Sequence, residues 1–318
     1  MSRILKWNGW LTAALTLVVA LCAATVQAQP NITCNNAGFG GVPITTYDFT
    51  GGATVASFVP TGATGANNGR GVLVLGNKVY YTELTGLGFG PTDFIRIAPF
   101  NGGAGGADIG TLANPRPTTG VQDVAFSGGA LYVLTGYPVD ALEVFKLDPL
   151  TGTVLSGPVA IAGPAAPNSD GFTVLPNGNF LINSGDGNCT YNQFNPSTGA
   201  LIPATTIVVP GASFCTGVET DGTSLFFETD LSGFTKTTLS GTFIASQTVA
   251  ANKCEDISLD LSACTGARGA IPGKPNCHGK CVSFLARTHG GIENAADDFG
   301  YASVEELQDA IHAFCGNP

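Results

Sequence analysis

The residues best suited to chemistry are polar side chains that open short apolar runs at repeated places along the chain. They are Arg70, Asp123, Asp170, Glu255 and Asp256. Converging carboxylates can hold Ca²⁺, because hard cations prefer several oxygen ligands. They can also serve as acid and base around a polar substrate. A structural interpretation is also open, because Asp at the start of a strand can satisfy the N–H groups of a turn.

Cysteine residues are the second group with chemistry. Beyond Cys22 their number is even, and the positions are Cys34, Cys189, Cys215, Cys254, Cys264, Cys277, Cys281 and Cys315. In an exported chain an even set indicates disulfides. We expect Cys189 to pair with Cys215, at the start of a third strand and at the opening of the next repeat. We also expect Cys277 to pair with Cys315, at the two ends of a C-terminal module.

Motifs for nucleophilic catalysis are missing from the sequence that follows Ala28. No Gly-x-Ser-x-Gly occurs there, and the first of the three histidines is His278, well after the repeats. The usual general base is therefore absent from the repeats, and we predict no catalytic residue. A zinc site of Cys277, Cys281, His312 and Cys315 is an alternative to disulfides in the C-terminal module, but export favours the disulfides.

The candidate residues are positioned by a repeat that is clearest over residues 120–154. Four apolar runs (121–126, 130–134, 141–147 and a run from 153) are separated by a Gly-Gly turn, a polar loop and the turn Asp-Pro-Leu-Thr-Gly. This pattern predicts a four-stranded antiparallel sheet. Equivalent starts occur at Arg70, Gln122, Asp170, Thr216 and Glu255. Their spacing of roughly 40 to 50 residues is typical of β-propeller blades.

The two ends of the repeat region are fragments of a blade. Residues 44–49 and 53–59 match the third and fourth strands of the repeat, whereas the stretch from Cys254 matches its early strands. We interpret residues 29–43 as a polar lead-in. The two fragments are expected to form one blade, which closes the ring and removes exposed sheet edges. The fold class is therefore mostly β, a five-bladed propeller; six blades stay open if residues 103–117 or the region of Cys34 hold further strands.

Over roughly residues 44–262 the repeats resemble the broad class of propellers that includes NHL-type and lactonase-type proteins. In such folds the first strand of each blade lines a central channel. The resemblance therefore implies that Arg70, Asp123, Asp170, Glu255 and Asp256 meet at the channel mouth, where ligands usually bind. WD40 blades need a Trp-Asp pair, and both Trp residues of this chain precede Ala28.

A different pattern follows the Gly/Pro/Ala linker at 265–276. The apolar period changes from 2 to about 3.6 residues. We expect helices at about 280–289 and 292–299, and a third helix capped by Ser303 with Glu306. Cys-His-Gly at 277–279, Val-Ser-x-Leu-Ala at 282–286, Gly-Gly at 290–291 and Leu-Gln-x-Ala-Ile-x-x-Phe-Cys at 307–315 resemble a small module on otherwise unrelated exported bacterial proteins. Its role there is unknown.

The stretch from Met1 to Ala28 predicts an export signal. Arg3 and Lys6 precede the apolar stretch 11–24, and Val-Gln-Ala at 26–28 fits a cleavage site. Lipid attachment at Cys22 is the alternative, although Leu21 does not suit the residue before it. No later apolar run reaches the ~20 residues that span a bilayer. The expected parts are a propeller at 29–264, a linker at 265–276 and a helical module at 277–318, in a periplasmic or extracellular protein.

The predicted mature chain is acidic. It keeps 11 of the 13 basic and all 23 acidic residues, a net charge of −12. Nucleic acid is an unsuitable partner, because phosphate binding needs clustered Lys and Arg. We expect a non-catalytic propeller that binds an unknown protein or small molecule, without a cofactor other than a candidate Ca²⁺ at the channel mouth. The alternative is a metal-dependent, lactonase-like hydrolase whose site lies at that mouth.

Overall fold

The computed structural model describes residues 31–36, 43–60, 68–75, 78–84, 94–101, 104–127, 130–137, 141–163, 169, 171–185, 187–249, 254–259, 276–298, 301 and 303–315. The predicted signal at 1–28, the linker at 265–275, Asp170 and Cys264 lie outside these residues. Within them, no helix is both long and apolar enough to cross a membrane.

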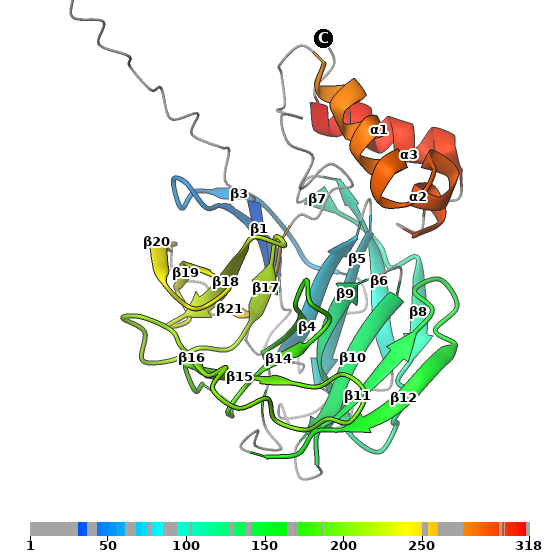
Figure 1. Ribbon diagram of the computed structural model, residues 1–318. Helices are drawn as coiled ribbons and strands as arrows, with labels where there is room; N and C mark the ends of the chain where they lie inside the picture. Colours follow the sequence, from blue (N-terminus) through cyan, green and yellow to red (C-terminus); the bar gives the residue numbers. More distant parts are fainter. Residues whose placement is uncertain are drawn as a thin grey trace, which may run out of the picture.

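The described residues form five antiparallel sheets, each of which is one blade (Figure 1). The first blade contains β4 (Asn68–Leu75), β5 (Lys78–Leu84), β6 (Phe94–Asn101), β7 (Ala104–Gly105) and β8 (Gly110–Ala113). The second contains β9 (Gly120–Ser127), β10 (Ala130–Tyr137), β11 (Glu143–Leu147) and β12 (Val154–Ala160). The third contains β13 (Phe172–Val174), β14 (Phe180–Asn183), β15 (Thr190–Phe194) and β16 (Ile207–Val208). The fourth contains β17 (Val218–Thr220), β18 (Ser224–Thr229), β19 (Gly233–Thr238) and β20 (Phe243–Thr248). The closing blade contains β21 (Cys254–Leu259), β1 (Asn31–Asn36), β2 (Ile44–Asp48) and β3 (Thr54–Phe58).

The five innermost strands form a closed ring. Each of β4, β9, β13, β17 and β21 contacts the next, and β21 contacts β4 again. The predicted five-bladed propeller is confirmed. The stretch 103–117 holds no sixth blade among its described residues: it contributes β7 and β8, and β8 completes the first blade by pairing with β6.

The closing blade joins the two ends of the propeller, as the fragments predicted. Its strand order is β21-β1-β2-β3, so the strands at 44–58 share a sheet with the strand at 254–259. The interpretation of residues 29–43 as a lead-in was wrong in part, because residues 31–36 form β1. The error has a physical reason, since most residues of this strand are Asn or Thr. Ile32 and Cys34 are nevertheless buried in the core, while Thr33 bonds to Thr46 of β2.

The hairpins between third and fourth strands share one type of turn in three blades: the second, the third and the closing blade. Asp148 follows β11, and its Oδ1 accepts the N–H groups of Leu150 and Thr151 at 2.9 and 2.8 Å. The turn ends at Gly152, whose φ of +70° suits a residue without a Cβ. Asp48 and Asn195 build the same turn after β2 and β15. This recurring turn explains why the Asp-Pro-Leu-Thr-Gly motif marks a blade.

The hydrophobic core lies between neighbouring blades. Leu73 and Tyr80 of the first blade pack in one cluster with Val121 and Leu131 of the second. The Tyr80 hydroxyl donates to the backbone oxygen of Pro149 at 3.0 Å, so the buried ring also keeps its polar end satisfied. Because each blade buries a face against the next, the inner strands are held in register around the channel.

Three short helices follow the propeller in sequence. They are α1 (Cys277–Thr288), α2 (Ile292–Asp298) and α3 (Val304–Cys315). The Ser303 hydroxyl accepts the N–H of Glu306 at 3.2 Å, so the predicted cap of α3 is present. Leu285, Ala295 and Leu307, one from each helix, meet in a small core.

Candidate functional site

One polar layer crosses the inner strands near their beginnings. Four blades contribute one buried side chain each: Arg70 of β4, Gln122 of β9, Thr216 shortly before β17, and Glu255 of β21. We call these four residues the first layer. The fifth equivalent position, Asp170, lies outside the described residues. The four residues are spread over positions 70 to 255 of the sequence. Only closure of the ring brings their side chains to the same end of the channel.

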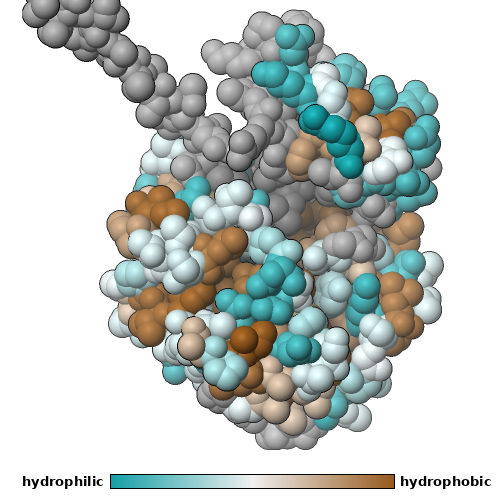
Figure 2. All heavy atoms as spheres, viewed as in Figure 1, coloured by the Kyte–Doolittle hydropathy of each residue, from teal (hydrophilic) through white to brown (hydrophobic). Residues whose placement is uncertain are grey.

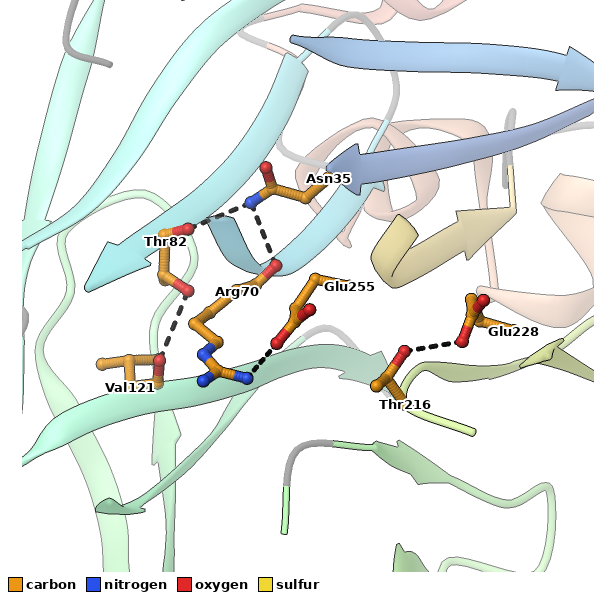
Figure 3. A network of polar contacts seen from close by, with 7 residues as sticks. All are labelled: Asn35, Arg70, Thr82, Val121, Thr216, Glu228 and Glu255. Carbon is orange, nitrogen blue, oxygen red and sulfur yellow. Dashed lines mark hydrogen bonds and ion pairs between the residues drawn. The ribbon is translucent and has the colours of Figure 1, made fainter. Parts of the chain in front are cut away.

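An ion pair and a chain of hydrogen bonds connect three of the blades at this layer (Figure 3). The Arg70 guanidinium binds the carboxylate of Glu255, and both side chains are nearly shielded from solvent. Asn35 of β1 donates its amide hydrogens to the backbone oxygens of Arg70 and Thr82, both at 3.0 Å. The Thr82 hydroxyl in turn donates to the backbone oxygen of Val121 at 3.4 Å. The network therefore runs from the closing blade through the first to the second.

A buried carboxyl group stands on the other side of Glu255. Glu228 of β18 is completely shielded, and its Oε2 accepts a hydrogen bond from the Thr216 hydroxyl at 2.8 Å (Figure 3). Its Oε1 has no hydrogen-bond partner among the described residues. Burial, with a smaller effect from the charge of Glu255, raises the pKa of Glu228 well above its ordinary value. Oε1 of Glu228 is therefore a buried polar atom that needs a hydrogen-bond partner, whether the carboxyl group is protonated or ionised.

Gln122 also has buried polar atoms without a hydrogen-bond partner among the described residues, and it has two of them. Its side chain is 0% exposed, and neither its amide oxygen nor its amide nitrogen has a hydrogen-bond partner among the described residues. A buried polar group without a partner costs ~1–3 kcal/mol. A residue that bears two such groups is therefore costly to the free protein, and a polar ligand would satisfy both.

A second layer lies one residue further along the inner strands. Asp123 of β9 and Asp256 of β21 are both buried, at equivalent positions of the second and the closing blade. Asp123 also accepts the N–H of Phe172 in β13 at 2.7 Å, and Asp256 accepts the N–H of Val72 in β4 at 2.7 Å. Burial raises the pKa of both groups, and the charge of Asp256 raises that of Asp123 further.

The structure thus arranges the predicted candidates as two pairs rather than one cluster. Arg70 binds Glu255, and the charge of Asp256 raises the pKa of Asp123. The backbone N–H groups that the two Asp residues accept fit the structural interpretation. Sequence reasoning missed Gln122, Thr216 and Glu228. The first two open repeats and were visible as such, and Glu228 is a charged residue inside the apolar strand 224–229.

The carboxylates of this region are mostly engaged within the protein. Among the residues that the structure describes, no group of three or more His, Cys, Asp or Glu side chains is placed to hold a metal ion. Glu255 binds Arg70, and Asp123 and Asp256 each accept a backbone N–H group of a neighbouring strand. The candidate Ca²⁺ stays a prediction.

Disulfides bind distant parts of the chain. Cys189 is joined to Cys215, as expected, and Cys34 of β1 is joined to Cys254 of β21 within the closing blade. Cys277 and Cys281 are also disulfide-bonded, so neither is a free thiolate for zinc. The side chain of Cys315 lies outside the described residues, and its pairing with Cys277 stays a prediction.

The outermost strands leave apolar side chains on the surface, and hydrophobic areas occur on the face drawn in Figure 2. The most exposed residues of these strands include Val154, Leu155, Val208, Phe243 and Ile244. Large apolar surface areas are typical of interaction sites, but these residues are spread over three blades.

Comparisons with known proteins add no family. No family model and no curated protein matches the chain. Many solved structures are similar to it, and three of them are described. A protein of unknown function from Bacteroides caccae is 11% identical (TM-score 0.48, 73% of this chain and 99% of that one). The WD40 β-propeller domain of Doa1 is 15% identical (TM-score 0.34, 60% and 57%). A glutaminyl cyclase from Myxococcus xanthus is 12% identical (TM-score 0.42, 69% and 95%). At such scores these similarities carry no functional argument, and the fold rests on the strand topology.

Proposed function

We propose that this chain is an exported, non-catalytic binding protein whose propeller takes a small polar ligand at the first layer. The observation that carries the proposal is the Gln122 side chain, which is fully buried with both amide atoms unpartnered among the described residues. The amide offers one acceptor and two donor hydrogens, and the nearby end of the channel offers Glu228 Oε1 as well. A ligand that both donates and accepts hydrogen bonds matches this set.

The described chemistry favours binding over catalysis. Among the described residues, Glu255, Asp123 and Asp256 each use at least one carboxylate oxygen within the protein, and Glu228 Oε1 and Asp256 Oδ1 are the oxygens of these acids without a hydrogen-bond partner. A lactonase-like hydrolase remains the alternative, and it would require Glu255 to leave Arg70 or the two Asp residues to release the N–H groups that they accept. The helices α1 to α3 are proposed to serve as an interaction module, on the resemblance of their sequence to a portable module of exported proteins.

The proposal is tested with Gln122→Leu, which removes the unpartnered amide and nearly keeps the side-chain size. We expect the variant without ligand to be more stable than wild type by ~1–3 kcal/mol, since a buried desolvation cost disappears. Thermal unfolding followed by circular dichroism measures this. A panel of amino acids, polyols and amines is then screened by thermal shift on both proteins. A binder should stabilise wild type and lose that effect in the variant.

Asn35→Leu is the matched control, because Asn35 is similarly buried but donates to backbone oxygens of the first blade. This control should lose stability. If Gln122→Leu also loses stability, Gln122 is a structural residue and the proposed site is wrong. Equal stabilisation of wild type and Gln122→Leu by a ligand would place its binding elsewhere.

A further inference from the structure

Two histidines of the helical module are stacked on each other. His278 lies in the first turn of α1, and His312 lies in the last turn of α3. Their ring centroids are 4.2 Å apart, and the ring planes are inclined by 24°. Because α1 and α3 also pack against each other, the stack joins the beginning of one helix to the end of the other. The Cys-His-Gly motif that opens the module in the sequence therefore has a partner in its last helix.

The His278 ring is the more enclosed of the two. Its Nε2 atom is buried and has no hydrogen-bond partner among the described residues, whereas His312 is exposed. A protonated imidazole carries a donor hydrogen on both ring nitrogens. Protonation of His278 would therefore place a charged donor where neither water nor a described acceptor reaches it, which is costly. The ring has to leave this position to be solvated in its charged form.

The helix ends reinforce the difference between the two rings. The start of a helix carries a partial positive charge from its free N–H groups, and the end carries a partial negative charge from its free carbonyl groups. His278 stands at an end that disfavours a cation, and the first turn of α1 holds no acidic residue to compensate for it. His312 stands at an end that favours a cation. The stack thus accommodates one positive charge, on the exposed ring, but not two.

We propose that the His278–His312 stack is an acid-sensitive latch, which keeps α1 and α3 packed while His278 is neutral and loosens them when both rings are charged. Loosening would expose part of the apolar core of the module, to which Leu285, Ala295 and Leu307 contribute one residue from each helix. The predicted Cys277–Cys315 disulfide would keep the two helix ends tethered, so the packing opens without the helices parting. An apolar surface for a partner would then be hidden near neutral pH and presented in acid.

The charges around the stack do not oppose this effect. Among the described residues, His312 is the charged group that acts on His278. Lys280, in the same turn of α1, adds a further positive charge. His289 lies at the opposite end of α1. The other described charges of the three helices are exposed: Arg287 of α1, Glu293 and Asp297 of α2, and Glu305 and Glu306 of α3. The side chains of Asp298 and Asp309 lie outside the described residues.

Linkage gives the sign of the effect. Burial, followed by the charge of His312, lowers the pKa of His278 in the folded protein. In the unfolded chain the pKa of a histidine is about 6.5, so the unfolded or opened form takes up the proton first. The stabilisation is therefore complete above about pH 6.5 and is lost as the pH falls from there toward the folded pKa. This direction is opposite to that of a buried carboxyl group, whose contribution is lost as the pH rises.

The inference is tested on the mature protein by hydrogen exchange of the α1 and α3 amides, measured by mass spectrometry and divided by the intrinsic exchange rates. In wild type we expect this ratio to be up to ~30-fold higher at about pH 5 than at about pH 7.5, since each pH unit below about 6.5 favours the opened form about tenfold. His278→Phe keeps an aromatic ring in the stack but cannot be charged, so its ratio should be the same at both pH values. His312→Phe should keep part of the dependence, because the burial of His278 remains.

His289→Gln is the matched control, because it removes the histidine outside the stack and should behave like wild type. A wild-type ratio that is the same at both pH values overturns the latch, and so does a pH dependence that persists unchanged in His278→Phe. If His278→Phe does not fold, His278→Gln is the second uncharged variant. Loss of the dependence in His289→Gln would assign the effect to His289 instead. The test uses no ligand and no residue of the first layer, so its result is independent of the proposed binding in the channel.

Discussion

Arg70 and Glu255 form a buried ion pair between β4 and β21, at the junction where the first complete blade meets the closing blade. The side chains are 3% and 10% exposed. They are 185 residues apart in the sequence, so the pair forms only when the ring is closed. The pair therefore reports on closure of the propeller rather than on the folding of one blade.

Removal of one partner should be costly. Arg70→Met leaves the Glu255 carboxylate buried without its cation, and we expect a loss of ~3–5 kcal/mol in the free energy of unfolding. The double variant Arg70→Met/Glu255→Met should lose less than Arg70→Met alone, because no unpaired charge remains. Urea denaturation of these proteins and of Glu255→Met measures all the losses. A double variant that loses the sum of the two single losses would mean that the two side chains do not interact.

The two mapped disulfides should differ in their contribution to stability. Cys34–Cys254 spans 220 residues, whereas Cys189–Cys215 spans 26. In the chain-entropy account the longer loop restricts the unfolded chain more, by about 2 kcal/mol. We expect Cys34→Ala/Cys254→Ala to lose more stability than Cys189→Ala/Cys215→Ala by about that amount. Equal losses in urea denaturation would indicate that the unfolded chain is already constrained near Cys34 and Cys254.

The sequence predicted the architecture better than the site. The turn that begins at Asp148 and the alternation of apolar and polar residues in each strand recur along the chain. The number of blades could therefore be predicted from the sequence. The strand at 31–36 could not be predicted in this way, because its burial depends on a partner strand at 254–259 and not on its own composition. The bonds of Asp123 to Phe172 and of Asp256 to Val72 likewise depend on the closed ring, since each joins strands of different blades. The free-energy cost of burying the Gln122 amide without hydrogen-bond partners could not be predicted at all, because the lack of a partner depends on the residues that surround it in the folded protein.

Glu219 should make the stability of the folded protein depend on pH. Burial raises its pKa to about 7, although hydrogen bonds from Thr220 and Thr173 partly oppose the shift. Because the folded pKa is the higher one, the stabilisation is complete below about pH 4.5 and is lost as the pH rises through about 7. The total is ~3 kcal/mol. Glu219→Gln keeps the acceptor for both Thr residues and should remove this part of the decline.

Stability curves against pH measure this contribution. Glu305→Gln in α3, at a position outside the propeller, is the control and should leave the curve unchanged. If Glu219→Gln has the same pH dependence as wild type, Glu219 is ionised in the folded protein. A combination of Glu219→Gln with Asp256→Asn should flatten the curve further than either change alone, because the two contributions belong to different carboxyl groups.

Two glycines should respond in opposite ways to a single methyl group. In Gly71→Ala the new Cβ would lie 2.8 Å from the Cα of Asp123 and 3.0 Å from the backbone nitrogen of Val124, and neither backbone atom can move without shifting β9. We expect a loss of ~1–3 kcal/mol from overpacking. Gly279 lies in α1 at an exposed position with no atom within 4 Å of an added Cβ. Gly279→Ala should therefore leave the propeller unaffected and stabilise α1 by ~1 kcal/mol, through helix propensity.

Urea denaturation compares the two glycine variants with wild type. Gly279→Ala controls for the general effect of an added methyl group. A Gly71→Ala protein as stable as wild type would show that β4 and β9 do not approach each other so closely.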